Sequence, residues 1–274
     1  MQPADDRMQR TKFTGLGPTA LAGILLFATA VIGGRWFAPA MAQADTPAAK
    51  APTVLITGAN RGLGLEFARQ LSAAGATVIG TARSPEKAEE LRALGVRVEA
   101  LDVADPESVA ALAKRLGETP IDILINNAGI GGRAPTLDAL DPELAARVYD
   151  VNCLGPMRVT KALLPALRRG DRKTVVNISS QLGSIERNGG GGYYGYRESK
   201  AALNMFTRSI AGELASDGFI CIAMSPGWVR TDMGGPQAPL SPEQSIRGML
   251  TVIDGLTPAK SGQFWNHDGE ELPW

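Results

Sequence analysis

The sequence is poor in the residues that metal sites, disulfide frameworks and imidazole catalysis require. Its 274 residues include 2 cysteines and 1 histidine. A structural zinc site takes about four Cys or His ligands, and a disulfide framework needs more cysteines than this chain has. His267, the single imidazole, lies near the C-terminal end and leaves little material for a Ser-His-Asp triad. We therefore expect no metal site, and acid–base chemistry must come from Tyr, Lys, Asp or Glu.

An excess of positive charge is also missing. The chain has 28 Lys+Arg and 28 Asp+Glu, without a basic stripe. Nucleic-acid binding needs clustered Lys and Arg to neutralise phosphates, so no nucleic-acid partner is expected. The length alone allows one large α/β domain or two small ones.

The N-terminal segment has the order of a secretory signal. Three basic residues, Arg7, Arg10 and Lys12, precede the uncharged stretch 13–34. Ala42-Gln43-Ala44 then provides a small-x-small cleavage site. This order predicts export to the periplasm.

Other interpretations of this segment stay open. Its apolar core, 21–32, is short for a membrane span, but flanking Gly and Ala residues extend it to about 20 residues, enough for an uncleaved anchor. The alternatives are an amphipathic or disordered extension, and a translation start at Met41 that would leave the protein cytoplasmic. The predicted organisation is a signal peptide or membrane anchor over 1–44, a linker over 45–52 and one catalytic domain over 53–274.

From residue 53 onward, short apolar runs alternate with segments of helical spacing. The runs are 53–57, 76–81, 96–101, 121–126, 174–179 and 219–225. Apolar strands alternating with helices indicate a parallel sheet covered on both faces. The predicted fold is therefore α/β, a Rossmann-type doubly wound parallel sheet in three layers and a single domain. Such folds bind ligands at the carboxyl ends of their strands.

A glycine-rich turn follows the first predicted strand and precedes a helical pattern. Gly58, Gly62 and Gly64 lie in the stretch TGANRGLG, with the spacing GxxxGxG instead of GxGxxG. Glycines allow a tight turn and a close approach to a pyrophosphate, whose charge is favoured at a helix N-terminus. Taken alone, the turn is a weak signal, and the alternative is a strand-to-helix connection that binds nothing.

The chain resembles the short-chain dehydrogenase/reductase family, which has the glycine motif TGxxxGxG. Four further matches occur at the expected places: Asn126-Asn127-Ala128-Gly129, Asn152, Tyr196-x-x-x-Lys200 and Pro226-Gly227. The resemblance runs from residue 53 to the C-terminus. The run from Gly183 to Phe206, the SPGWVRTDMGG segment and the C-terminal Trp are similar to the branch of C-factor and sniffer-type carbonyl reductases.

The residues support the catalytic pair independently of the resemblance. Tyr196 and Lys200 are four residues apart, so on a helix they share one face. A neighbouring ammonium favours the phenolate form of a tyrosine, which makes Tyr196 a usable acid–base catalyst. The rival phenols Tyr193 and Tyr194 meet Arg197 and Glu198 at the same spacing. An isolated Tyr four residues before a Lys is more commonly a surface pair.

The resemblance assigns a serine that donates a hydrogen bond to the reacting oxygen. Ser180 follows a predicted strand directly, but it lies 16 residues before Tyr196, whereas the family spacing is about 12 or 13. Ser184 has the shorter spacing and is the alternative. We favour Ser180, because its place at the strand end is fixed and the run Gly189 to Gly192 has the character of an insertion. Ser179 points to the opposite face of the strand.

The remaining catalytic role implied by the resemblance belongs to Asn152, which would hold a water that links Lys200 to solvent. The alternative is a buried asparagine that satisfies local backbone groups. In the implied mechanism, Tyr196 protonates the carbonyl oxygen as hydride arrives from the nicotinamide, and Lys200 bonds the ribose.

The end of the second predicted strand indicates the cofactor. Arg83 stands there without an acid, and Arg61 adds positive charge in the glycine turn. Guanidinium groups suit a 2′-phosphate, so NADP(H) is preferred and NAD(H) is the alternative. The cofactor-binding residues implied by motif and resemblance are Gly58, Asn60, Arg61, Gly62, Leu63, Gly64, Arg83, Asp102, Val103, Asn127, Ala128, Gly129, Tyr196, Lys200, Pro226, Gly227, Val229 and Thr231.

The predicted function is NADP(H)-dependent reduction of a carbonyl compound to an alcohol, or the reverse. Trp228, Met233 and Tyr193 are among the pocket candidates and favour an apolar, partly aromatic substrate, although the same residues would also suit a core. A nucleotide-binding signalling protein of the C-factor type and an enoyl or quinone reductase are the alternatives. A homo-oligomer is compatible with the sequence.

Overall fold

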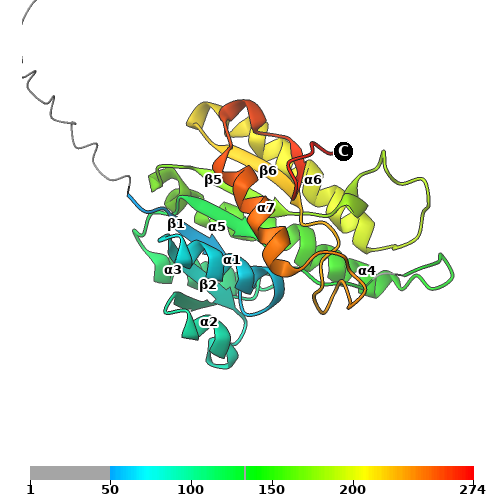
Figure 1. The fold of residues 1–274 in the computed structure, drawn as a ribbon, viewed down its shortest axis with the longest axis horizontal. Helices are drawn as coiled ribbons and strands as arrows, with labels where there is room; N and C mark the ends of the chain where they lie inside the picture. Colours follow the sequence, from blue (N-terminus) through cyan, green and yellow to red (C-terminus); the bar gives the residue numbers. More distant parts are fainter. Residues whose placement is uncertain (1–49, 133) are drawn as a thin grey trace, which may run out of the picture. The chain divides into compact units, whose positions relative to one another are not determined.

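One parallel sheet of seven strands organises the described part of the chain, residues 50–132 and 134–274 of a computed structural model (Figure 1). The strands are β1 (Thr53–Ile56), β2 (Thr77–Ala82), β3 (Arg97–Ala100), β4 (Ile123–Asn126), β5 (Thr174–Ile178), β6 (Ile220–Ser225) and β7 (Phe264–Asn266). Their order in the sheet is β3-β2-β1-β4-β5-β6-β7. The six predicted strands are all present, and β7 is an addition whose three residues are too short to show a period.

Helices cover both faces of this sheet. They are α1 (Gly62–Ala73), α2 (Glu89–Ala93), α3 (Pro106–Leu116), α4 (Pro142–Tyr149), α5 (Gly155–Arg169), α6 (Tyr196–Glu213) and α7 (Pro242–Asp254). Buried residues of α1, α2 and α7 pack in one cluster, and those of α3, α5 and α6 pack in another on the opposite face. The predicted doubly wound fold of three layers is confirmed.

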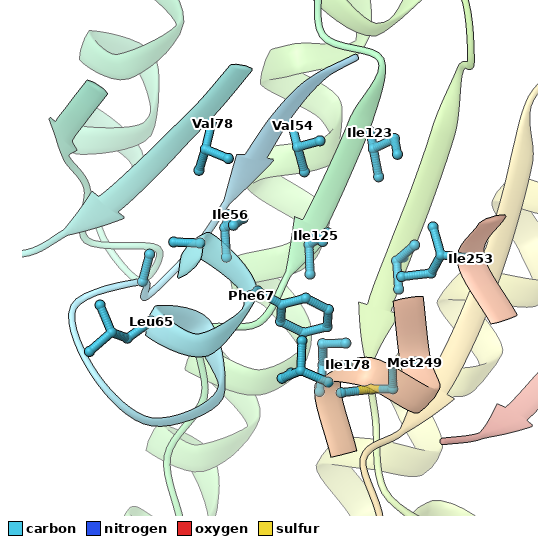
Figure 2. Packing of buried hydrophobic residues seen from close by; sticks show 14 of the residues in the cluster. Val54, Ile56, Leu65, Phe67, Val78, Ile123, Ile125, Ile178, Met249 and Ile253 are labelled. Carbon is cyan, nitrogen blue, oxygen red and sulfur yellow. The ribbon is translucent and has the colours of Figure 1, made fainter. Parts of the chain in front are cut away.

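Alternation along β1 explains why the core divides in two. Val54 and Ile56 belong to the cluster with α1 and α7, whereas Leu55 belongs to the cluster on the other face. Figure 2 shows Val54 and Ile56 on the same side of the sheet as Phe67 and Met249, from α1 and α7. Each such fully buried side chain contributes about 1.5–3 kcal/mol relative to an exposed one. This packing fixes α1 against the sheet and thereby fixes the glycine turn.

The strand order reverses at β1, which is paired with β2 on one side and β4 on the other. The connection from β1 therefore leaves in one direction and that from β4 in the other, the arrangement in which such folds bind ligands at the carboxyl ends of the strands. Residues following β1, β4, β5 and β6 all meet at this edge of the sheet.

The segment that contains Asn152 is not a regular α-helix. A π-helical turn over Asp150–Leu154 separates α4 from α5. Such turns insert a residue into a helix and are frequent at functional sites. The insertion gives Asn152 a direction different from that of a regular helix position.

The predicted signal peptide or anchor over 1–44 lies outside the described residues. Among the residues that are described, no helix is long and apolar enough to cross a membrane. The residues that are described belong to one compact unit, Ala49–Trp274.

Candidate active site

The glycine turn after β1 forms a cradle with an open helix N-terminus. Gly58 and Gly62 have positive φ angles of 64° and 55°, which non-glycine residues rarely adopt. A Cβ at Gly64 would collide with the carbonyl oxygen of Gly58, so the turn closes this tightly only with glycine there. α1 begins without a side-chain cap and without an acid in its first turn. Its free N–H groups and dipole therefore favour an anion.

The stretch after β4 braces this turn. Asn127 Nδ2 donates to the carbonyl oxygens of Thr57 and Gly58, at 2.9 and 3.1 Å. The backbone N–H groups of Asn127 and Ala128 both donate to Thr57 Oγ1, at 2.9 Å each. Gly129 is exposed, and it lies close to Lys200 Nζ, which would be 3.8 Å from a Cβ added there. The predicted floor residues thus lie between the glycine turn and Lys200.

Tyr196 and Lys200 occupy the first two turns of α6, on one face. Lys200 Nζ lies 5.8 Å from the centre of the Tyr196 ring and donates a hydrogen bond to the carbonyl oxygen of Ile178, at 2.9 Å. Lys200 is 5% exposed, and no carboxylate among the described residues forms an ion pair with it. Burial disfavours its charged form and lowers the pKa of Lys200 to about 8. An ammonium with this pKa can lose and regain a proton near neutral pH.

Asn152 is fully buried and its side-chain amide holds the backbone at Ile130. Oδ1 accepts from Ile130 N at 2.8 Å, and Nδ2 donates to Ile130 O at 3.0 Å and to Ser199 Oγ at 3.1 Å. A Cβ at Gly129 would lie 3.2 Å from Oδ1. The side chain therefore satisfies local backbone groups, and its role in holding a water beside Lys200 stays a prediction.

The two candidate serines are in different environments. Ser180 comes after β5 and Ser179, is half-buried, and accepts a hydrogen bond at Oγ from Leu182 N at 3.2 Å. Ser184 is 1% exposed and donates from Oγ to the carbonyl oxygen of Trp274 at 3.2 Å. Ser179 is directed to the other side, where Oγ donates to Asn204 Oδ1 at 2.6 Å. Of the three, Ser180 has the strand-end position and the accessibility that contact with a substrate requires.

The rival phenol Tyr193 is on the loop before α6. The Arg197 guanidinium lies 5.7 Å from the centre of its ring. This is the pairing that the spacing of four residues suggested.

Sequence reasoning missed the buried polar residues that hold this edge together. Asn204 is one helical turn beyond Lys200, and its Nδ2 donates to the carbonyl oxygen of Gly183 at 3.2 Å. It thereby links α6 to the short 3-10 turn η3 (Gln181–Gly183) that follows Ser180. Its position four residues after Lys200, on the same helix face, was a usable signal.

The predicted adenosine-side residues lie at the ends of β2 and β3. Arg83 is exposed, and it forms no ion pair with any described residue. Asp102 uses Oδ1 to accept from Ala104 N at 3.0 Å, and Val103 is buried against the start of α5 at Gly155. Arg61 Nη1 lies 2.8 Å from Asp232 Oδ2 in an exposed ion pair, and its contact with the cofactor stays a prediction.

The segment after β6 turns back toward the glycine cradle. Gly227 has a φ of 77°, and the carbonyl oxygen of Pro226 accepts a hydrogen bond from Ser245 Oγ of α7 at 2.7 Å. Val229 is buried, whereas the methyl group of Thr231 would be 3.8 Å from a Cβ at Gly62. Asn60 and Leu63, also predicted to contact the cofactor, lie in the turn itself.

Large apolar side chains remain exposed near these segments. The exposed fractions are 56% for Trp228, 39% for Met233 and 42% for Tyr193. Cys153 and Cys221 are buried free thiols, and no cluster of three or more His, Cys, Asp or Glu suited to a metal occurs in the described residues.

Comparison with known proteins places this geometry in a family. The family model for short chain dehydrogenases matches residues 52–239. C-signal from Myxococcus xanthus is 49% identical over 164 residues, which are 60% of this chain and 99% of that protein.

Two solved structures are similar over 82% of this chain. They are carbonyl reductase Sniffer of D. melanogaster, with a TM-score of 0.77, 32% identity and 100% of that chain covered, and the NADPH-bound carbonyl reductase from chicken fatty liver, with a TM-score of 0.76, 36% identity and 99% covered. The chain therefore belongs to the short chain dehydrogenase family.

Proposed function

We propose that this chain is an NADP(H)-dependent carbonyl reductase. The observation that carries the proposal is the buried Lys200 ammonium beside the Tyr196 ring, close to the braced glycine cradle. Two structurally similar proteins are carbonyl reductases, and one of them binds NADPH. A fold of this kind has many uses, so the side-chain constellation matters more than the architecture.

The cradle fits a dinucleotide. Its open helix N-terminus suits a pyrophosphate, and the unpaired Arg83 at the end of β2 suits a ribose 2′-phosphate. Asp102 and Val103, after β3, would border the adenine. Pro226, Gly227, Val229 and Thr231 would border the nicotinamide side. When bound, the cofactor supplies the hydride.

The chain's own residues then manage the proton. Tyr196 holds a proton at its hydroxyl oxygen and gives it to the substrate oxygen. Lys200 stabilises the phenolate that results and orients the ribose hydroxyls, while Ser180 donates a hydrogen bond to the substrate oxygen. Asn152 keeps Ile130 in place beside Gly129 and so maintains the space next to Lys200.

The proposal is tested by NADPH oxidation with a panel of aldehydes, ketones and quinones, and with an enoyl substrate for comparison. Tyr196→Phe should bind NADPH with unchanged affinity while its turnover falls by about 10²–10⁴-fold. Glu118→Ala changes an exposed side chain on the loop between α3 and β4, at the opposite end of the strands. It is the control for expression and purification of a variant protein. Equal turnover by wild type and Tyr196→Phe would contradict the assigned role of the tyrosine.

A signalling protein that binds the nucleotide is the second candidate, because of the similarity to C-signal. If wild type binds NADPH and reduces no carbonyl compound in the panel, this candidate is favoured. Reduction of a C=C bond in product analysis would favour the enoyl reductase instead.

We also propose export for the N-terminal segment, on its sequence alone. N-terminal sequencing of the natively expressed protein tests it. A terminus at Asp45 supports cleavage after Ala44, whereas a terminus at Met41 or Ala42 indicates an internal start and a cytoplasmic protein. Retention of the whole segment in a membrane fraction would indicate the anchor.

A further inference from the structure

The carbonyl oxygen of Trp274 is hydrogen-bonded to residues 184–186, a segment that follows Ser180 and precedes α6. It accepts hydrogen bonds from Ile185 N at 2.9 Å, from Glu186 N at 3.1 Å and from Ser184 Oγ at 3.2 Å. Three donors that converge on one oxygen define the position of this segment closely. The segment belongs to the connection that joins Ser180 to Tyr196.

The Trp274 side chain is itself anchored at two points. Its ring stacks on Phe264 of β7, with centres 5.6 Å apart and an angle of 20° between the planes. The Arg208 guanidinium of α6 lies 5.9 Å from the ring centre. Figure 1 shows the chain ending beside α6. The carbonyl oxygen is thus held by groups that belong to the sheet and to the catalytic helix.

Two further contacts join the same parts of the chain. Gln181 Nε2 donates to Asn266 Oδ1 at 3.1 Å, and Arg187 Nη2 lies 2.8 Å from Glu270 Oε1. We call Asn266, Glu270 and Trp274 the C-terminal clamp. Its contacts span the connection from Gln181 to Arg187.

The contacts of the C-terminal clamp end at Arg187, and the first three glycines that follow have no close neighbours. A Cβ added at Gly189, Gly190 or Gly191 would meet no atom within 4 Å. These glycines are exposed, so the stretch 189–191 projects into open space, in contrast to the anchored half of the connection from Gln181 to Arg187. The anchored half is the one that adjoins Ser180.

The anchored half transmits its position to the catalytic residues through η3. A Cβ at Gly183 would lie 2.8 Å from Lys200 Cβ, which shows that η3 packs directly on α6 at the lysine. Asn204 Nδ2 bonds the Gly183 carbonyl oxygen at 3.2 Å. Ser180 caps η3 through the hydrogen bond from Leu182 N. Displacement of Ser184 would therefore move Ser180 relative to Lys200.

We propose that Trp274 is a positioning residue that sets Ser180 against Tyr196 and Lys200. The inference rests on the proposed carbonyl reductase function. Tyr196 lies 16 residues after Ser180, and a connection of this length with four consecutive glycines costs more conformational entropy to order than a shorter one. The clamp supplies contacts that offset this cost. A displacement of about 1 Å at a reacting group can lower a rate by about 10²-fold.

The kinetic test is a double-mutant cycle with the full chain. Trp274→Ala should lower kcat by about fivefold or more and leave the KM for NADPH within about twofold, because the glycine cradle is not touched. In a Ser180→Ala background the same change should alter kcat by less than about twofold, since the residue acts through Ser180. Trp274→Phe should restore kcat, because a phenyl ring retains the stack on Phe264. Glu271→Ala, exposed on the same segment, is the matched control.

Ser184→Ala provides a second variant that keeps the fold, since it removes one donor to the Trp274 carbonyl oxygen. It should lower kcat partially, and again without further effect in the Ser180→Ala background. Equal fold-losses with and without Ser180 would overturn the proposal and leave Trp274 a stabilising residue only. A larger loss for Ser184→Ala than for Ser180→Ala would identify Ser184 as the serine that contacts the substrate, and would also overturn it.

Hydrogen exchange separates failure of this inference from failure of the proposed function. The amides of Ile185 and Glu186 should be protected in wild type and in Trp274→Phe, and should exchange faster in Trp274→Ala. This result is independent of turnover. Unchanged exchange in Trp274→Ala would contradict the clamp even in an active enzyme, whereas a wild type without carbonyl turnover would contradict the proposed function with the clamp intact.

Discussion

Asn127 Nδ2 is hydrogen-bonded to the carbonyl oxygen of Thr57, at 2.9 Å, across the point where the strand order reverses. The amide reaches from the end of β4 to the end of β1 and bonds Gly58 O as well. Backbone carbonyls at the start of the glycine turn thus receive their donors from a side chain of another strand. This contact gives the Asn-Asn-Ala-Gly motif a structural reason beside any contact with a cofactor.

Asn127→Ala should therefore loosen the cradle. Each lost hydrogen bond is worth about 0.5–1.5 kcal/mol, so the free energy of unfolding should fall by about 1–3 kcal/mol. The Kd for NADPH should rise by about tenfold, because the turn must be reordered on binding. Denaturant unfolding and fluorescence titration measure the two effects.

The control for this substitution is Asn188→Ala, on the exposed loop, where the side-chain oxygen accepts one hydrogen bond from Gly191 N. It should leave the NADPH affinity unchanged. A normal affinity in Asn127→Ala would show that the turn keeps its shape without the brace.

The pH dependence of turnover should report Lys200. Burial lowers the pKa of this lysine to about 8, so its ammonium is fully charged below that pH and neutral above it. A charged lysine stabilises the Tyr196 phenolate and holds a proton that can replenish it, so kcat for carbonyl reduction should fall as pH rises through about 8. Lys200→Arg stays charged throughout and should lack this alkaline limb, at a lower overall rate. A limb at the same pH in both proteins would assign it to another group.

Much of the fold followed from pattern, because its determinants are local. The apolar strands of the sheet interior, such as β1 and β4, are continuous runs that only a sheet covered on both faces explains. The glycine turn was recognisable because the positive φ of Gly58 and the close approach at Gly64 restrict those positions to one residue type. Tyr196 and Lys200 share a helix face by spacing alone.

The parts that escaped prediction depend on contacts distant in sequence. β7 has three residues and exists as a strand because β6 pairs with it. Asn152, in the π turn, is hydrogen-bonded to Ile130, and Arg61 forms an ion pair with Asp232. In both cases the partner is more than twenty residues away in the sequence. The sequence marks Trp274 as similar to a feature of the family branch. Its hydrogen bonds to Ile185 and Glu186 join residues that are far apart in the sequence, so the sequence pattern does not predict them.

Cofactor preference should depend on Arg83. The side chain is exposed at the end of β2 and forms no ion pair with a described residue, so its guanidinium is available to a 2′-phosphate. Hydrogen bonds between charged groups are worth about 1.5–3 kcal/mol, so Arg83→Asp should weaken NADPH binding by about 10–100-fold. The new carboxylate should accept from a ribose 2′-OH and improve the use of NADH.

Lys114→Asp is the matched control for Arg83→Asp, because it changes the charge equally on the exposed face of α3. Steady-state KM values for both cofactors measure the preference. An NADPH to NADH ratio that is unchanged in Arg83→Asp would place the phosphate elsewhere.

Burial of Cys221 should lower the free energy of unfolding at alkaline pH. Burial raises the pKa of this thiol to about 12 from an unperturbed 9.0. Above pH 9 the unfolded chain loses this proton while the folded chain retains it, so the thiol's contribution to stability is complete below pH 9 and declines above it. Between pH 9 and about pH 10, Cys221→Ala should show a shallower loss of unfolding free energy, by up to about 1.4 kcal/mol per pH unit. Parallel slopes by denaturant unfolding would show that the thiol is accessible to base in the folded chain.

The ion pair between Arg61 and Asp232 should compete with the cofactor. It joins the glycine turn to the segment after β6, and both side chains are mostly exposed, at 71% and 81%. Such exposed pairs are worth about 0–1 kcal/mol. Asp232→Asn would release Arg61 for the phosphates, so the Kd for NADPH should fall by up to about fivefold. The gain should disappear at high salt, because the pair is then screened in wild type as well. A rise in Kd would mean instead that the ion pair holds the turn in its binding shape.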